Sequence, residues 1–274
     1  MINSVGIIGG DKRQKYLSEL FRSSGASVHT AMNSLCGADR LTDALSASII
    51  VLPVPLSRAG THLNCTYAEK PIELNCLYNL LPIGGTVFGL GAEKAAEIGC
   101  VAYDYASRED FAINNALPTA EGAIALAINA CDGVLCSSRC LVVGYGRIGK
   151  LLAVRLDALG AHVTVAARSA GDIATANAFG FETIRSDRLG DYDLDYECIF
   201  NTVPARLLEP VADKISRRTV IELASAPFGI SGECARENSI TLVNGSGLPG
   251  RTAPKYAAKV IFSTIQSIIA EECL

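Results

Sequence analysis

The chain has 274 residues, a formal net charge of −4 and a hydrophobic fraction of 49%. This length accommodates two domains of ordinary size, and the small acidic charge without a Lys/Arg-rich run argues against a nucleic-acid surface. The sequence has no apolar run long enough to cross a bilayer and no secretory signal pattern, so we expect a cytoplasmic protein without a membrane partner.

The first half of the chain alternates between predicted strands and predicted helices. One helix is expected over 13–21, ended by Gly25, and another over 92–98. Short apolar, β-branched runs predict the strands 5–8, 27–30, 48–52, 86–90 and 100–103. Because strands that alternate with helices form parallel sheets, this half is expected to be a flavodoxin-like or Rossmann-like domain.

Two further helices are predicted where the halves join. Residues 120–131 are Ala-rich and apolar nearly all round, as in a helix buried between two domains, and Thr119 is placed to cap this helix. Residues 253–270 have apolar positions at helical spacing, with Pro254 in the first turn. Because this last helix follows the last strand of the second half, it can return to the first domain.

The sequence therefore predicts an α/β protein with two doubly wound, parallel-sheet domains and a cleft between them. The substrate domain is expected to comprise residues 1–118 plus 253–274, and the cofactor domain residues 119–252. The strands expected in the cofactor domain are 140–143, 163–167, 182–184, 198–201, 220–223 and 240–243. Clefts of this kind are common sites for small ligands.

The mid-chain run LVVGYGRIGK changes from an apolar strand pattern into Gly-x-Gly-x-x-Gly. In such a motif Gly144 permits a tight turn, Gly146 lets the backbone approach a pyrophosphate, and Gly149 lets the helix pack closely on the strand. The pattern predicts a dinucleotide site, to which Arg147 and Ile148 also contribute. The alternative is a glycine turn without a cofactor.

The end of the next strand distinguishes the two nicotinamide cofactors. NAD sites usually place Asp or Glu there, whereas this chain has Arg168 and Ser169. Arg pairs bidentately with a 2′-phosphate, so NADP is favoured, and NAD is the alternative if Arg168 is a solvated loop charge. Further cofactor contacts are expected after later strands, at Thr202, Val203, Pro204, Ser225 and Gly247, unless these are simple loop residues.

The ten cysteines are scattered, without a Cys-x-x-Cys pair or a neighbouring histidine set. We therefore expect free thiols and no metal site.

The chain resembles the A subunit of dipicolinate synthase along nearly its whole length. The resemblance lies in the order of IIGGDKRQ from Ile7, LPTAEG from Leu117, VGYGRIG from Val143, ARS from Ala167, NTVP from Asn201, ELAS from Glu222, GLPG from Gly247 and APK from Ala253. It implies a nicotinamide-dependent oxidoreductase that acts during sporulation with a flavoprotein-like B subunit. The reaction implied is oxidation of dihydrodipicolinate, or of its hydrated tetrahydro precursor, to dipicolinate.

The resemblance also extends to the architecture of the 2-hydroxyacid dehydrogenases, in which the cofactor domain is inserted into the substrate domain. One departure from the family lies at Glu222, where Asp is more common. The change keeps the carboxylate but moves it outward by one methylene.

A small dicarboxylate substrate calls for cations or helix N-termini. We expect Arg13, after the first strand, and Lys255, in the first turn of the returning helix, to bind its carboxylates, although Arg13 can equally be a solvated charge. Lys255 and Glu121 are the catalytic candidates, with Glu121 as base. Thr119 is expected to position the substrate, unless Thr119 and Glu121 only begin their helix. Ser57 is a candidate carboxylate ligand or a plain loop residue.

Two other functions stay open. A 2-hydroxyacid dehydrogenase needs a base for the hydroxyl proton, usually a His held by a carboxylate. None of His29, His62 and His162 lies in the late loop 245–250, which argues against this function. A non-catalytic subunit that senses NADP would show the same sequence features. From the family resemblance and the hydrophobic composition we also expect the chain to self-associate as a homo-oligomer or to bind the B subunit, through an apolar, alanine-rich surface.

Overall fold

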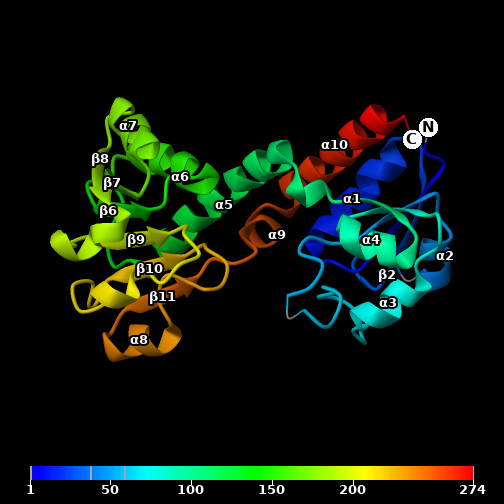
Figure 1. Ribbon diagram of the computed structural model, residues 1–274, viewed down its shortest axis with the longest axis horizontal. Coiled ribbons are helices and arrows are strands. Elements are labelled where there is room, and N and C mark those ends of the chain that lie inside the picture. Colours follow the sequence, from blue (N-terminus) through cyan, green and yellow to red (C-terminus); the bar gives the residue numbers. More distant parts are fainter. Residues whose placement is uncertain (1, 38, 59, 274) are drawn as a thin grey trace. The chain divides into compact units, whose positions relative to one another are not determined.

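The structure is a computed structural model that describes residues 2–37, 39–58 and 60–273. The chain divides into two compact units (Figure 1). Unit 1 comprises Met1–Asn115 with Ala253–Leu274, and unit 2 comprises Ala116–Thr252. The chain therefore leaves unit 1 and returns to it after completing unit 2.

Unit 1 is built on a five-stranded sheet with the order β2-β1-β3-β4-β5, in which every pair of neighbouring strands is parallel. The strands are β1 (Ser4–Ile8), β2 (Ser27–Ala31), β3 (Ile49–Val51), β4 (Thr86–Phe88) and β5 (Val101–Tyr103). This is the flavodoxin-like order. In such sheets ligands bind beyond the carboxyl ends of the strands where the order reverses, which here is between β1 and β3.

Helices cover both faces of this sheet. The helices α1 (Lys12–Ser23) and α10 (Pro254–Glu272) pack side by side on one face, and α2 (Leu41–Leu45), α3 (Leu74–Leu80) and α4 (Ala92–Ile98) cover the other. Successive side chains of β1 pack on opposite faces of the sheet, because side chains alternate along a strand. Ile7 packs in the core with Phe21 of α1, whereas Ile8 packs in the core with Leu77 of α3.

Unit 2 is built on a six-stranded parallel sheet with the order β11-β10-β9-β6-β7-β8. The strands are β6 (Arg139–Val143), β7 (His162–Ala167), β8 (Glu182–Arg185), β9 (Cys198–Asn201), β10 (Thr219–Glu222) and β11 (Thr241–Asn244). Numbered within the unit, this is the order 3-2-1-4-5-6 of a Rossmann domain, and its strand order reverses between β6 and β9. The predicted class, two doubly wound α/β domains, is confirmed.

The helices of unit 2 likewise lie on both faces of its sheet. One core contains side chains of α5 (Glu109–Ala130), α6 (Arg147–Ala158), α7 (Ala170–Ala178) and α9 (Leu248–Thr252). The other core contains α8 (Gly232–Glu237) and the turns between β9 and β10. Because the sheet is covered on both faces, the edge at the carboxyl ends of its strands is the place where ligands of such folds bind.

The predicted start of the helix at Thr119 is wrong. Helix α5 begins at Glu109 and continues through Pro118, so Thr119 lies in its interior and does not cap it. A proline inside a helix costs about 3 kcal/mol or more, because it removes a backbone hydrogen bond and crowds the preceding turn. Burial of Phe111 before the proline and of Ala120 after it offsets this cost.

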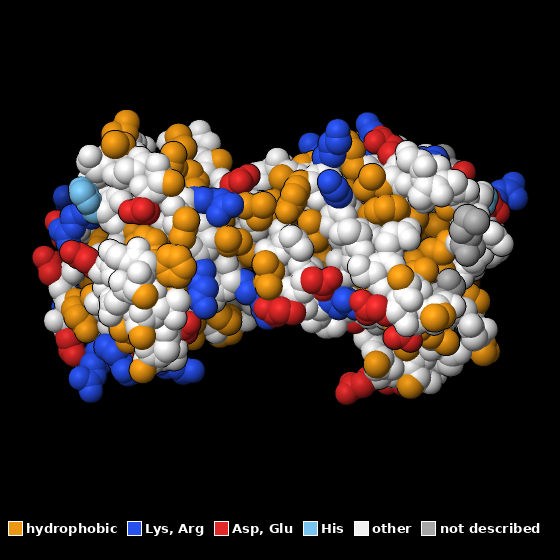
Figure 2. All heavy atoms as spheres, turned by 90° about the horizontal axis from the view of Figure 1, so that it is seen from above, with side chains coloured by type: hydrophobic (Ala, Val, Ile, Leu, Met, Phe, Trp, Pro, Cys, Tyr) orange, Lys and Arg blue, Asp and Glu red, His pale blue; other side chains and the backbone are white. Residues whose placement is uncertain are grey.

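On the face shown in Figure 2, Lys/Arg and Asp/Glu side chains are interspersed over both units. This distribution agrees with the small net charge of −4. Within the described ranges, the structure contains no helix with the length and apolar character of a membrane span.

Candidate functional site

The glycine motif lies at the switch point of the unit 2 sheet. Val143, the last residue of β6, is paired in register with Asn201, the last residue of β9. Thr202 then joins the two strand ends, because its Oγ1 donates a hydrogen bond to the Val143 carbonyl at 2.8 Å. A Cβ atom on Gly144 would lie 2.3 Å from this Oγ1, and the φ of Gly144 is +99°. Only glycine fits this turn.

The other two glycines of the motif have opposite surroundings. A Cβ atom on Gly149 would lie 2.1 Å from the carbonyl oxygen of Gly144, so α6 packs directly on the turn. A Cβ atom on Gly146 would meet no described atom within 4 Å. Gly146 is also the N-cap of α6, and no side chain there accepts a hydrogen bond from the first helical turn. This opening and the uncapped N–H groups fit the pyrophosphate of a nicotinamide dinucleotide.

Arg147 and Ile148 form the first turn of α6, beside this opening. The Arg147 side chain is exposed and that of Ile148 is half-buried. Both therefore lie where the motif predicts cofactor contacts.

At the end of β7 the structure gives Arg168 and Ser169 different roles. Arg168 is exposed. Ser169 is the N-cap of α7: its Oγ accepts a hydrogen bond from the Asp172 N–H at 3.0 Å and donates one to Asp172 Oδ2 at 2.7 Å. In this structure the Ser169 hydroxyl therefore donates its proton to Asp172. Asp172 was not predicted from the sequence, although the Ser-x-x-Asp spacing at a helix start could have indicated it.

A buried hydrogen-bond network holds the loops that follow β9 and β10. Asn201 Nδ2 donates to the Val203 carbonyl at 3.0 Å and to Glu222 Oε1 at 2.8 Å. Glu222 also accepts hydrogen bonds from the backbone N–H groups of Ala224, at 3.0 Å, and Gly229, at 2.8 Å. Burial raises the pKa of the Glu222 carboxyl above its usual value, and these donors oppose the rise. Asn201 and Glu222 therefore position the rim residues, a role that was not predicted from the sequence.

The remaining rim residues are accessible. The loop residues Pro204 and Ser225 are exposed, and Val203 is half-buried. Gly247 has a φ of +68° and immediately precedes α9, with no described atom within 4 Å of an added Cβ. These residues, together with Thr202, follow the carboxyl ends of neighbouring strands of the same sheet.

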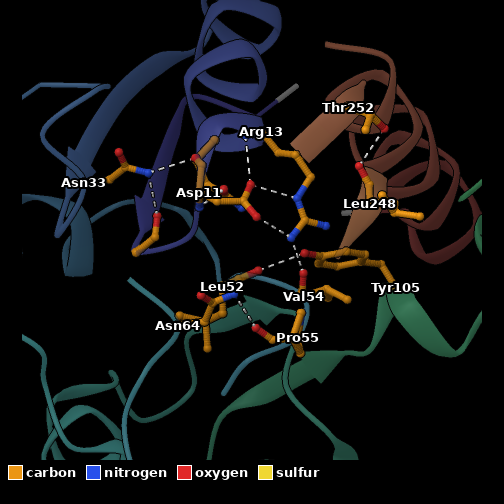
Figure 3. A network of polar contacts seen from close by, with 12 residues as sticks. Asp11, Arg13, Asn33, Leu52, Val54, Pro55, Asn64, Tyr105, Leu248 and Thr252 are labelled. Carbon is orange, nitrogen blue, oxygen red and sulfur yellow. Dashed lines mark hydrogen bonds and ion pairs between the residues drawn. The ribbon is translucent and has the colours of Figure 1, made fainter. Parts of the chain in front are cut away.

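In unit 1 a buried ion pair lies at the corresponding switch point (Figure 3). The guanidinium of Arg13 binds Asp11 through two hydrogen bonds, from Nε at 2.9 Å and from Nη2 at 3.0 Å. Nη2 also donates to the carbonyl of Val54, in the loop after β3. Arg13 is only 6% exposed. The alternative that Arg13 is a solvated helix charge is therefore wrong.

One member of the ion pair, Asp11, also caps the N-terminus of α1. The Asp11 N–H donates to Gln14 Oε1 at 2.7 Å. Burial alone would raise the pKa of the Asp11 carboxyl, but the hydrogen bonds and charge of Arg13, with a smaller contribution from Arg58, lower it below its usual value. Asp11 is thus held as a carboxylate. Asn33 fixes the same turn through Nδ2, which donates to the carbonyls of Gly9 at 3.2 Å and Asp11 at 3.0 Å.

The other predicted substrate residues of unit 1 are more exposed than Arg13. Ser57 is half-buried, and its Oγ accepts a hydrogen bond from the Gly60 N–H at 2.9 Å. Arg58 is exposed, and its charge acts on Asp11. Lys255 is exposed in the first turn of α10, where it lines a groove of about 610 Å³ with Tyr16 and Glu19 of α1. Arg58 was not proposed from the sequence, although it adjoins Ser57.

The two candidates on α5 differ in exposure. Thr119 is 8% exposed and lies inside the helix. Glu121 is exposed, and its Oε1 lies 3.8 Å from Nε of Arg155 on α6. Within unit 2, the neighbour of Glu121 is therefore a surface cation.

Comparisons with known proteins agree with this architecture. Residues 4–103 match the family model described as the N-terminal domain of the dipicolinate synthase A subunit. The A subunit of dipicolinate synthase from Bacillus subtilis (strain 168) is 29% identical, over 97% of this chain and 96% of the relative.

More distant solved structures share only the fold. The D-lactate dehydrogenase of Escherichia coli, for example, is 13% identical, with a TM-score of 0.60 over 98% of this chain and 96% of that chain. The chain therefore shares its fold with this dehydrogenase.

Two solved structures are more similar. The crystal structure of the dipicolinate synthase A subunit from Bacillus halodurans has a TM-score of 0.86 and 27% identity, and the alignment covers 98% of each chain. The corresponding crystal structure from Bacillus subtilis has a TM-score of 0.84 and 26% identity, over 99% of this chain and 97% of that chain. The family model, the relative and both structures that this chain resembles are thus all dipicolinate synthase A subunits.

Proposed function

We propose that this chain is the A subunit of a dipicolinate synthase and oxidises dihydrodipicolinate, or its hydrated tetrahydro precursor, to dipicolinate with NADP. The observation that carries the proposal is the glycine turn of unit 2. It leaves space beside Gly146 and has no room for a side chain at Gly144 or Gly149. Such a turn is suited to a dinucleotide. The similarity to dipicolinate synthase A subunits supports the same function.

The residues that would hold the cofactor are the glycine turn, the first turn of α6, Arg168 and the rim residues Thr202, Val203, Pro204, Ser225 and Gly247. When bound, a nicotinamide cofactor supplies the hydride acceptor for the oxidation. The Asn201–Glu222 network would keep the rim fixed while the substrate is oriented, because precise orientation lowers the entropy cost of the reaction.

The substrate would bind through its two carboxylates. In unit 1, Arg13 Nη1 has no hydrogen-bond partner among the described residues, so it can donate to an anion while Nε and Nη2 stay on Asp11. Arg58 and Ser57 adjoin the same loop and would add a second cation and a hydroxyl. Lys255 is proposed for the other carboxylate.

Conversion of a dihydropyridine into an aromatic pyridine requires loss of one hydride and one proton. Aromaticity supplies much of the driving force, so a weak base is sufficient. Glu121 is the proposed proton acceptor, and Thr119 is proposed to position the substrate. The chain would act in the cytoplasm of a sporulating cell with a flavoprotein-like B subunit, as a homo-oligomer or as part of that complex.

The alternative of a 2-hydroxyacid dehydrogenase finds less support. His162 begins β7 and so lies at the amino-terminal edge of the sheet, opposite the glycine turn. His29 lies within β2 of unit 1, and His62 is exposed. A histidine base is therefore not placed at the rim of unit 2 among the described residues.

The proposal is tested by incubating the full chain, with and without the B subunit, with NADP and a freshly generated dihydropyridine dicarboxylate. We expect NADPH and dipicolinate to form in equal amounts. NADPH formation from small 2-hydroxy acids instead would identify the dehydrogenase alternative. NADP binding without turnover, even with the B subunit present, would identify a regulatory subunit.

A further prediction concerns cofactor choice. Arg168→Ala is expected to weaken NADP binding about tenfold to a hundredfold and to leave NAD binding nearly unchanged, because a charge-assisted contact to the 2′-phosphate contributes about 1.5–3 kcal/mol. Fluorescence titration of both cofactors measures the change. Arg236→Ala, at an exposed position of α8, is the control. An NADP preference that survives Arg168→Ala would contradict the assignment.

A further inference from the structure

Three cysteines gather at the amino-terminal edge of the unit 2 sheet, opposite the glycine turn. Cys131 directly follows α5, Cys140 lies in β6, and Cys198 is the first residue of β9. Cys140 and Cys198 are register partners on neighbouring strands. Cys131 packs against the core that contains Cys140 and Cys198, and it lines the same cavity as Cys198 and Thr219. All three cysteines are free in this structure.

A cavity of about 200 Å³ gives access to two of these thiols. Its lining includes Cys131, Cys198 and Thr219, with Glu197, Arg217 and Arg218. Cys131 is half-buried, whereas the Cys198 side chain is buried but still borders the cavity. A small, uncharged oxidant can therefore reach Cys131 first, with Cys198 directly behind it.

The surroundings favour the thiolate form of Cys131 and the thiol form of Cys198. The hydrogen bond from Cys198, supported by Thr219, lowers the pKa of Cys131 to about 7, although burial, Asp132 and Glu197 oppose this shift. The C-terminal end of α5 opposes it as well. The pKa of Cys198 is raised, first by its hydrogen bond to Cys131 and then by burial.

Two cations line the same cavity. Arg218 is paired with Asp195, whereas Arg217 is exposed. Burial raises the pKa of Cys140 to about 12, so this thiol is much less nucleophilic than that of Cys131. The three cysteines are also not arranged as a metal site: among the described residues no group of three or more His, Cys, Asp or Glu side chains is placed to hold an ion.

We propose that Cys131 and Cys198 form a redox-active dithiol that hydroperoxides convert into a reversible disulfide. The Cys131 thiolate attacks one peroxide oxygen, which breaks the O–O bond and gives a sulfenic acid and a hydroxide or alkoxide; this leaving group takes up a proton from solvent to become water or an alcohol. The Cys198 sulfur then displaces the hydroxyl group, which takes up the Cys198 proton and leaves as water. Two thiols are oxidised by two electrons and one peroxide is reduced.

The disulfide would join the end of α5 to the start of β9. Strand β9 ends at Asn201, in the network that supports the rim of the glycine turn. The proposed modification site therefore lies on the same strand as a positioning residue of the candidate site, at the opposite end.

The test is peptide mapping of the full reduced chain after treatment with equimolar hydrogen peroxide. Trypsin places Cys131 in peptide 109–139, Cys198 in 189–206 and Cys140 in 140–147, so each pairing gives a distinct cross-linked mass. We expect a link between 109–139 and 189–206 that dithiothreitol removes. Because peptide 109–139 also contains Cys136, the link must persist in Cys136→Ser and disappear in Cys131→Ser.

Alkylation of the wild-type chain is an independent measurement that needs no variant. At pH 7 we expect iodoacetamide to modify Cys131 several-fold faster than exposed Cys76 or Cys136, since an ordinary thiol is only a few per cent ionised there. Equal rates would overturn the proposal. So would a Cys140–Cys198 link, or oxidation of Cys131 to sulfinic acid without any link.

Discussion

We expect Gly146→Val to bind NADP about a hundredfold more weakly than the wild type while remaining folded. The space around Gly146 is open to an added side chain, since no described atom lies within 4 Å of its Cβ position. The valine methyl groups would instead occupy the place where the backbone approaches the pyrophosphate. The loss of even two charge-assisted hydrogen bonds to the phosphates, each worth about 1.5–3 kcal/mol, accounts for this factor.

Gly91→Val is the matched control for this substitution. Gly91 is also the N-cap of a helix in a parallel α/β unit, has extended backbone angles, lacks a side-chain cap and meets nothing within 4 Å of an added Cβ. Calorimetric titration with NADP should show wild-type affinity for Gly91→Val. If Gly146→Val binds equally well, the glycine turn does not hold the cofactor.

The second large effect is expected on stability. Asp11→Ala should lower the free energy of unfolding by about 3–5 kcal/mol, because it leaves the buried guanidinium of Arg13 without its carboxylate. The two side chains are only 12% and 7% exposed. The substitution also removes the N-cap of α1, which adds to the loss. Denaturant unfolding followed by circular dichroism measures the change.

The pH dependence of this effect has a defined sign. The folded-state pKa of Asp11 lies below its unfolded value, so its contribution is complete above the unfolded pKa of about 3.9 and is lost as the pH falls through the folded value. The stability difference between wild type and Asp11→Ala should therefore be constant near neutrality and shrink below about pH 4.

Asp187→Ala provides a control with the same chemistry on the surface. Asp187 also pairs with an arginine two residues away, through Arg185 Nε at 2.9 Å and Nη2 at 2.7 Å, but both side chains are exposed. Solvent screens such a pair, so little or no destabilisation is expected. If both variants unfold at the same denaturant concentration, burial does not decide the contribution of the Asp11–Arg13 pair.

Much of the fold follows from local patterns in the sequence. The apolar runs near Val5 and Val163 coincide with β1 and β7, because short, continuous apolar runs are typical of strands buried on both faces of a parallel sheet. The three glycines at 144, 146 and 149 also stand where their spacing predicts a turn between strand and helix. In each case, a pattern of residues close together in the chain is sufficient to predict the element.

The sequence by itself thus determined the parallel α/β class, nearly all of the strands and the glycine turn. Only the tertiary structure decided that α5 starts at Glu109, that Arg13 is paired internally, and that Cys131 and Cys198 line one cavity. These features depend on packing between segments far apart in the chain. Burial can offset a helix-breaking proline such as Pro118, and it can bring a charge or a thiol to a partner that no local spacing reveals.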